Sequence, residues 1–319
     1  MRRTFICILG MMCFVCLCEA QITTSHVAPK QTIEPIVPPF DSTRNFLFND
    51  NVKSYIGQSL YVNGKSKLLR DSGYKNFRTE KEPSNKSDKW GEPAKSNPNN
   101  TKFEDLYGKC FVVRDVQPDS KQRDKWWFQL QNKDVPEEVV WFEYDGLYFP
   151  FITVSYFNYL KNTLVGKKYV LKYNVNENGV CETWVENKDF NTGESFVQKK
   201  EDRWECTEIT IEDEFFSLVA LIKNQRGNVA AVETGSLIPA DGSHQCFEES
   251  IFNTLVNKYG AGNIDNVRQG KIRVGMPKAL LLMSWGEPDK INRSSHGPDQ
   301  WVYGYQYVYV QNGKITAWN

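Results

Sequence analysis

The chain has 319 residues, of which 40% are hydrophobic and 24% are charged. That length predicts two or three small domains rather than one core. Its 39 basic and 39 acidic residues give a formal net charge of zero, which argues against nucleic acid and other polyanions as partners.

The first 20 residues have the pattern of a signal peptide. Arg2 and Arg3 form a basic start, residues 5–17 are apolar, and Ala20 is a small residue at the expected cleavage point. The apolar stretch is shorter than the roughly 20 residues that span a bilayer as a helix. We therefore expect cleavage before Gln21, no transmembrane span in the mature chain, and an exported protein that is periplasmic, outer-membrane-associated or secreted.

Two alternatives for this leader stay open. It could remain uncleaved as an anchor. It could also carry lipid on Cys18 or Cys16, although Val15-Cys16-Leu17 lacks the small residue usually found before a lipidated cysteine. Either alternative would hold the protein at a membrane.

The rest of the chain divides by composition. Residues 21–45 are rich in Thr and Pro and predict a tether. Residues 46–150 and 151–240 contain the alternation of apolar and polar residues that is typical of strands. We expect two small SH3-like β-barrel modules there, the first with a polar surface insertion near residues 71–103. Residues 245–319 predict an α+β domain, so the expected fold is mainly β with a C-terminal α+β domain.

A faint repeat relates the two β modules. "YIGQSLYVN" and "LVGKKYVLKYN" align with Gly57 opposite Gly166, an offset of 109 residues (166 − 57). A second strand follows in each module, with Cys110 and Cys206 loosely equivalent, and a hairpin-like pair of strands then closes each module. A short helix over residues 151–164 could connect the two modules.

Three tryptophans on the predicted strands are candidate binding residues. Trp126 and Trp127 are adjacent, so on a strand they point to opposite faces, one toward the core and one outward. Together with Trp141 they could stack on a sugar or on a peptide side chain. The alternative is that they fill the cores of small barrels.

The C-terminal region changes its period. Apolar residues recur every three or four positions over residues 247–259 and predict an amphipathic helix that ends at Gly260. A second helix is predicted from Pro277 to Trp285. Three strands are expected next, over residues 300–304, 305–310 and 314–318, and Asn312-Gly313 predicts a tight hairpin between the last two.

The segment "GMPKALLLMSWGEPDKI", followed by "QWVYG", "YVYV" and "NGKITAW", resembles the small outer-membrane-assembly lipoprotein family (SmpA/OmlA-like), whose fold is shared with β-lactamase inhibitor proteins. The resemblance covers residues 245–319. It implies that helices pack on a meander, and it implies a scaffold or binding role without catalytic residues. Family members are typically short and lipidated near the N-terminus, whereas this region ends a long chain. The matching positions are Gly275, Gly286, Pro288, Trp301, Tyr303 and Gly313.

Glycine and proline in "WGEP" are interpreted as turn signals rather than a phosphate loop. Gly286 falls just after the predicted helix, and Pro288 prevents the helix from continuing. The segment lacks the further glycines and the lysine of a phosphate loop.

Four cysteines remain after the leader: Cys110, Cys181, Cys206 and Cys246. An even number in an exported chain could form two disulfides with three connectivities, or the four could be free thiols. No two have CxxC spacing and only His244 lies near one of them, so no metal site is predicted.

No catalytic residues and no cofactor are predicted. Ser294, Ser295, His296 and Asp299 fall within one turn, whereas catalytic triads are assembled from separate parts of a fold. The acidic run of residues 212–214 is interpreted as a solvated turn.

These features favour an exported binding or scaffold protein of a bacterial cell envelope that acts through protein–protein contacts with an envelope or extracellular protein. The alternatives are a glycan- or peptidoglycan-binding protein and an inhibitor of a secreted enzyme. The candidate contact residues are Trp126, Trp127, Trp141, Trp301, Tyr303 and Tyr305.

Overall fold

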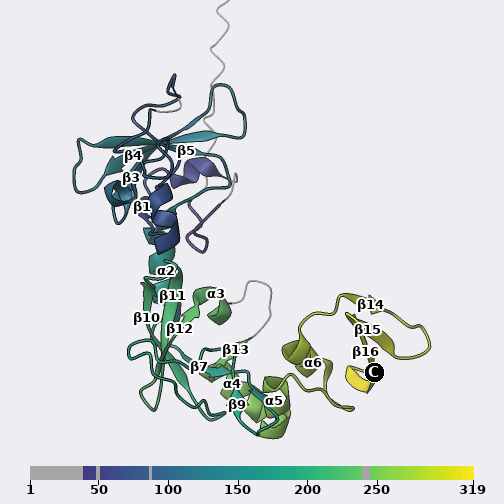
Figure 1. The fold of residues 1–319 in the computed structure, drawn as a ribbon. Helices are drawn as coiled ribbons and strands as arrows, with labels where there is room; N and C mark the ends of the chain where they lie inside the picture. The colour runs from purple at the N-terminus through teal and green to yellow at the C-terminus, as the bar shows by residue number, and fades with distance from the viewer. Residues whose placement is uncertain (1–38, 48–50, 86–87, 239–244) are drawn as a thin grey trace, which may run out of the picture. The chain divides into compact units, whose positions relative to one another are not determined.

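The computed structural model describes residues 39–47, 51–85, 88–238 and 245–319 (Figure 1). The predicted signal peptide, most of the predicted tether and His244 lie outside these residues. Within them the chain is mainly β, as predicted, with strands in a six-stranded, a five-stranded and a four-stranded sheet and one two-stranded hairpin. None of the described helices is long and apolar enough to cross a membrane.

The first sheet has the strand order β2-β5-β4-β3-β1-β6, and neighbouring strands are antiparallel. Its strands are β1 (Ser59–Val62), β2 (Phe77–Arg78), β3 (Cys110–Pro118), β4 (Trp126–Asn132), β5 (Val139–Tyr144) and β6 (Phe151–Thr153). Three short helices accompany them: η1 (Val52–Tyr55), η2 (Lys67–Ser72) and α1 (Phe103–Leu106).

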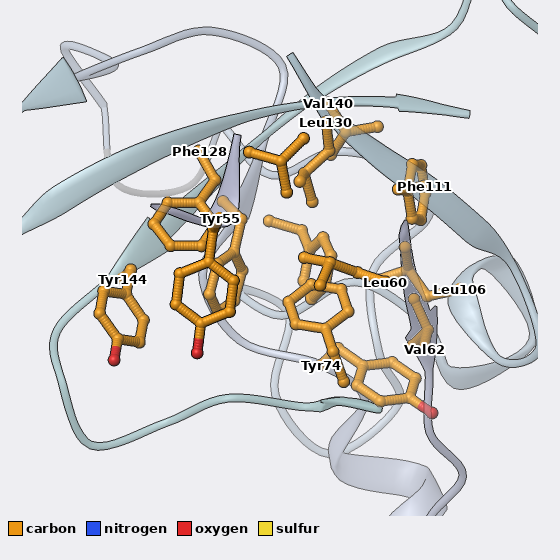
Figure 2. Close-up of a cluster of buried hydrophobic side chains, with 14 of the residues drawn as sticks. Tyr55, Leu60, Val62, Tyr74, Leu106, Phe111, Phe128, Leu130, Val140 and Tyr144 are labelled. Atoms are coloured by element: carbon orange, nitrogen blue, oxygen red, sulfur yellow. The ribbon is translucent and has the colours of Figure 1, made fainter. Parts of the chain in front are cut away.

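An aromatic-rich core lies on one face of this sheet (Figure 2). Phe128 and Leu130 of β4 point into the core because alternate residues of a strand share a face. The polar insertion also contributes to this core through Tyr74 and Phe77, which are fully buried. Its Pro-, Asn- and Ser-rich composition hid this role, because two aromatic side chains are too few to produce a visible period.

The second sheet has the order β12-β11-β10-β7-β13 and is also antiparallel. Its strands are β7 (Lys168–Leu171), β10 (Trp204–Ile211), β11 (Leu218–Asn224), β12 (Val229–Glu233) and β13 (Cys246–Glu248). Helix α2 (Val154–Leu164) precedes the sheet, hairpin β8 (Asn174–Val175) and β9 (Cys181–Glu182) follows β7, and α3 (Thr234–Leu237) follows β12. A core of its own surrounds the fully buried Trp204.

The two sheets repeat the same backbone plan. Without β2, the first order is β5-β4-β3-β1-β6, which corresponds strand for strand to β12-β11-β10-β7-β13. The N–H of Gly57 donates to the Val113 carbonyl at 2.8 Å, and the N–H of Gly166 donates to the Cys206 carbonyl at the same distance. Both glycines have φ of +84°.

A register shift between β3 and β4, and another between β10 and β11, shows which residues of the two sheets are equivalent. The register between β3 and β4 shifts after Val113, and the register between β10 and β11 shifts after Cys206. Val113 is therefore the counterpart of Cys206, an offset of 93 residues (206 − 113). The predicted equivalence of Cys110 and Cys206 is wrong by three residues, because both lie on strands whose composition does not distinguish neighbouring registers.

The C-terminal part consists of three helices and a four-stranded antiparallel sheet. The helices are α4 (Glu249–Tyr259), α5 (Ala261–Arg268) and α6 (Lys278–Trp285), and the strands are β14 (Lys290–Asn292), β15 (Asp299–Tyr303), β16 (Gln306–Gln311) and β17 (Lys314–Trp318). Helix α6 lies against β17, α5 against α6, and α4 against α5 and against β7 and β13 of the second sheet. Three details differ from the prediction: residues 246–248 form a strand against β7, α5 was not expected, and β14 adds a fourth strand.

The turn residues of this part have left-handed backbones. Gly275, Gly286 and Gly313 have φ of 85°, 83° and 73°. Gly286 follows the last residue of α6, and its N–H donates to the Leu282 carbonyl at 2.8 Å. Asn312 and Gly313 both have positive φ, as a type I′ hairpin turn requires.

Candidate functional site: two aromatic surfaces

Trp126 and Trp127 occupy opposite faces of β4. Trp126 pairs with Tyr144 and packs against the core of the first sheet. Trp127 points to the outer face, yet only 3% of it is exposed, and its indole Nε1 donates to Asp119 Oδ2 at 2.8 Å. The loop that supplies Asp119 thus buries a tryptophan that the strand pattern alone would leave exposed.

A groove of about 380 Å³ opens beside Trp127 on the outer face of the sheet. We call it the tryptophan groove. Two loops border it, residues 79–83 and residues 119–125, and Glu82 joins them by accepting hydrogen bonds from the amide and the hydroxyl of Ser120. Its lining is Asn76, Arg78, Glu82, Pro83, Asp119, Lys121, Gln122, Lys125, Trp127 and Glu143.

The carboxylates of the tryptophan groove are engaged within the protein. Lys125 Nζ lies 2.6 Å from Glu143 Oε1, and this hydrogen bond raises the pKa of Lys125. Asp119 also accepts the N–H groups of Lys121 and Gln122, each at 2.8 Å. Burial alone would raise the pKa of Asp119, but its bonds from Trp127 and from these two amides lower it.

Arg78 is the most deeply buried cation of the groove, with 9% exposed. Within the described residues its guanidinium makes two long hydrogen bonds, from Nη1 to the carbonyls of Phe77 at 3.3 Å and Asn99 at 3.4 Å. Burial lowers its pKa, while Glu143 and Asp88 act on it in the opposite direction from beyond ion-pair distance. Trp141 is its cross-strand neighbour and is half-buried on the same outer face.

The second sheet carries aliphatic residues at the equivalent positions. Val219 pairs with Glu233 as Trp127 pairs with Glu143, and Ala231 pairs with Leu221 as Trp141 pairs with Gln129. Val219 and Leu221 form a small buried cluster together with Val229 and the partly buried Ala231. Asp189 and Phe190 bond to the backbone of Val229 there.

The three C-terminal candidates differ in exposure: two lie on the core side of the last sheet and one lies in a turn. Trp301 is 7% exposed and belongs to the core beneath the sheet. Tyr303 is half-buried, its hydroxyl donates to the Gly286 carbonyl at 3.1 Å, and its ring contacts Trp285 edge-on. Tyr305, in the β15–β16 turn, is 99% exposed.

The opposite face of this sheet carries tyrosines that the sequence analysis did not select. Tyr307 pairs with Val302, and Tyr309 pairs with Gln300. Gln300 Nε2 donates to the Tyr309 hydroxyl at 3.2 Å. The alternation in "YVYV" contains this information, since buried Val308 and Val310 must leave the tyrosines on the other side. We call this surface, together with Tyr305, the tyrosine face: Gln300, Val302, Tyr305, Tyr307 and Tyr309.

The four cysteines of the described residues are free thiols. Cys110 and Cys181 are half-buried, and Cys206 and Cys246 are buried. Within the described residues no group of three or more histidine, cysteine, aspartate or glutamate side chains could hold a metal ion.

The two polar clusters weighed as catalytic have local contacts. The Ser295 hydroxyl lies 2.7 Å from His296 Nδ1 in an exposed turn. Glu212 accepts the backbone N–H groups of Glu214, Phe215 and Ser217, so its carboxylate organises a turn.

Comparisons with known proteins assign no family. No protein-family model matches the chain, and neither the curated proteins nor the solved structures contain a significant match.

Proposed function

We propose that this chain is an exported, non-catalytic binding protein of a bacterial cell envelope, which holds a partner protein against the tyrosine face. Its two β modules are proposed to be SH3-like, supported by their shared antiparallel order of five strands. Its C-terminal part is proposed to belong with the small outer-membrane-assembly lipoproteins, supported by a hydrophobic cluster that α6 shares with one face of an antiparallel meander.

The observation that carries the proposal is the composition of the tyrosine face. One face of the C-terminal sheet buries Trp301, Val308 and Ile315 against the helices. The other face leaves Tyr307 36% exposed, and Tyr305 in the adjoining β15–β16 turn is 99% exposed. Tyrosine is enriched where proteins meet, because it combines a large apolar ring with a polar hydroxyl at low entropic cost.

A double variant tests this assignment. Tyr305→Ser with Tyr307→Ser removes two exposed rings without touching the core, so the fold should be unchanged. A photo-crosslinking residue at position 305 of the full chain would first identify the partner in the native envelope. The purified partner should then bind the double variant at least about tenfold more weakly than wild type, a loss of about 1.4 kcal/mol.

Leu147→Ser is the matched control, since Leu147 is 86% exposed but lies on a turn of the first module. It should leave the affinity unchanged. Equal affinities of the double variant and the wild-type chain would rule out the tyrosine face as the contact surface.

A further inference from the structure

The tryptophan groove contains a cation, Arg78, whose hydrogen-bonding capacity is not used up by the residues that the structure describes. Arg78 carries five N–H donors, and the two long carbonyl contacts described above both start from Nη1. Among the described residues it forms no ion pair with a carboxylate; Glu143 is paired with Lys125, and Asp119 accepts the indole N–H of Trp127. A buried charge without a close partner is costly, so an anion that enters the groove would gain an interaction rather than compete for one.

The geometry of a guanidinium specifies what kind of anion fits. Its planar fork matches a carboxylate, which it binds with two parallel hydrogen bonds. Lys121 lines the same groove and is exposed, which adds a second positive charge for a ligand arriving from solvent.

The remaining lining suits hydroxyl groups. Asn76 donates its Nδ2 to the Glu143 carbonyl at 2.9 Å, which leaves its amide oxygen as an acceptor, and Gln122 contributes a second amide. Trp127 provides an indole wall, and half-buried Trp141 lies beside Arg78 on the same face. The volume of about 380 Å³ is at the small end of the range for small-molecule sites.

An extended peptide fits this groove less well than a small ligand does. Peptides that bind to sheets usually add a strand at a free edge. The edge of β5 next to the groove is already paired with β2, so a peptide would find no free edge of β5 to pair with there.

We propose that the tryptophan groove binds an acidic sugar, a pyranose whose carboxylate is held by Arg78 and whose hydroxyls meet the amides and the indole wall. The site is specific to the first module, because the second places Val219 and Ala231 at the positions of Trp127 and Trp141. The inference is independent of the tyrosine face.

Titration of the purified full chain with sodium D-glucuronate tests the proposal, with tryptophan emission and calorimetry as readouts. D-glucose and a tetraglutamate peptide are the comparison ligands, one without the carboxylate and the other without the sugar ring. Glucuronate should bind saturably, and neither comparison ligand should saturate over the same range.

Variants then locate the site. Arg78→Met should weaken glucuronate binding about tenfold or more, because it removes a charge-assisted bidentate contact, and Arg78→Lys should also weaken it because the planar fork is lost. Lys121→Glu, at an exposed position that leaves the core intact, should weaken it too. Arg114→Met is the matched control, since Arg114 is exposed on the same sheet and bonds to Gln131 outside the groove.

Three results would overturn the proposal. The first is the absence of saturable glucuronate binding to a folded wild-type chain. The second is an equal effect of Arg78→Met and Arg114→Met, or no effect of Lys121→Glu. The third is Arg78-dependent binding of tetraglutamate but not of glucuronate, which would assign the groove to acidic peptides. Loss of partner binding by the tyrosine-face variant would affect none of these results.

Discussion

Cys206 and Cys246 are the two thiols for which burial has the largest effect. Desolvation raises the pKa of Cys206 to about 11 and that of Cys246 to about 12. An unfolded thiol ionises near pH 8.5, so the folded chain keeps these protons after the unfolded chain has lost them. The associated stability is present below about pH 8.5 and declines as the pH rises toward 11 and 12.

The register of β7 keeps these two thiols apart. Cys206 and Cys246 lie on the two strands that flank β7. The backbone N–H of Cys206 donates to the Lys167 carbonyl, and Cys246 pairs with Leu171. Four residues along a strand correspond to about 13 Å, whereas disulfide-bonded Cα atoms lie within about 7 Å. A bond between Cys206 and Cys246 would therefore require β7 or its neighbours to be rebuilt.

Iodoacetamide at pH 8 should modify the native chain at Cys110 and Cys181, which are half-buried, and spare Cys206 and Cys246. In denaturant without a reductant all four should react. Intact-mass spectrometry counts the adducts. Fewer than four adducts in denaturant, rising to four only after reduction, would show that disulfides form in the mature protein.

The prediction of single residues from sequence succeeded where the cause is local. Strand alternation placed Trp126 and Trp127 on opposite faces, and the structure has them so. It could not foresee that Trp127 is covered, because Asp119 reaches it from a loop that Glu82 holds through Ser120, and the paths of such loops depend on tertiary packing. Tyr307 and Tyr309 were available from the alternation in "YVYV" but were overlooked.

Elements were predicted best where a turn residue and a hydrophobic period agree. The hairpin at Asn312-Gly313 and the end of α6 at Gly286 are examples. Helix α5 was missed because Ile264 and Val267 are its only fully buried apolar residues, too few to define a period. Residues 246–248 continue the apolar pattern of α4 but form β13, since pairing with β7 outweighs the local helical signal.

Gly57→Ala and Gly166→Ala should destabilise the chain equally. Both glycines have φ of +84°, and a Cβ at either position would meet no atom within 4 Å. Backbone strain is then the main cost, about 1–2 kcal/mol for each substitution. Urea unfolding followed by tryptophan fluorescence measures it.

Gly235→Ala provides the control for these two variants. Gly235 lies in α3 without a positive φ, and a Cβ there also meets no atom within 4 Å. It should be neutral or slightly stabilising. A clear difference between Gly57→Ala and Gly166→Ala would contradict the equivalence of the two backbones at this position.

At the scale of the molecule, three main hydrophobic clusters take the place of one core. Length and composition predicted two or three small domains, because a chain of this size exceeds what one small core organises, and that division into domains stays a prediction. They could not predict which surface binds a partner. That depends on which aromatic residues the loops cover and which they leave exposed. The path of a loop cannot be read from the spacing of hydrophobic residues.

We propose export by a cleaved signal peptide, so the protein purified from its natural source should begin at Gln21 by intact-mass spectrometry. The basic, apolar and small-residue pattern of the leader is the reason. A mass that includes the first 20 residues would contradict export by a cleaved signal. A diacylglycerol adduct on a chain beginning at Cys18 or Cys16 would place the protein on a membrane and strengthen the proposed relation to the assembly lipoproteins.

The repeated strand register has a practical consequence for engineering. In the first sheet, paired residues Leu60 and Phe111 are 51 positions apart in the sequence (111 − 60). The equivalent pair in the second sheet, Tyr169 and Trp204, is only 35 positions apart (204 − 169). The paired residues Gln129 and Trp141 are 12 positions apart in the sequence, and the equivalent pair Leu221 and Ala231 is 10 positions apart. The same scaffold thus closes with different connection lengths in one polypeptide. The exposed β4–β5 connection is accordingly a suitable place to insert an epitope tag or a fluorophore-labelling peptide.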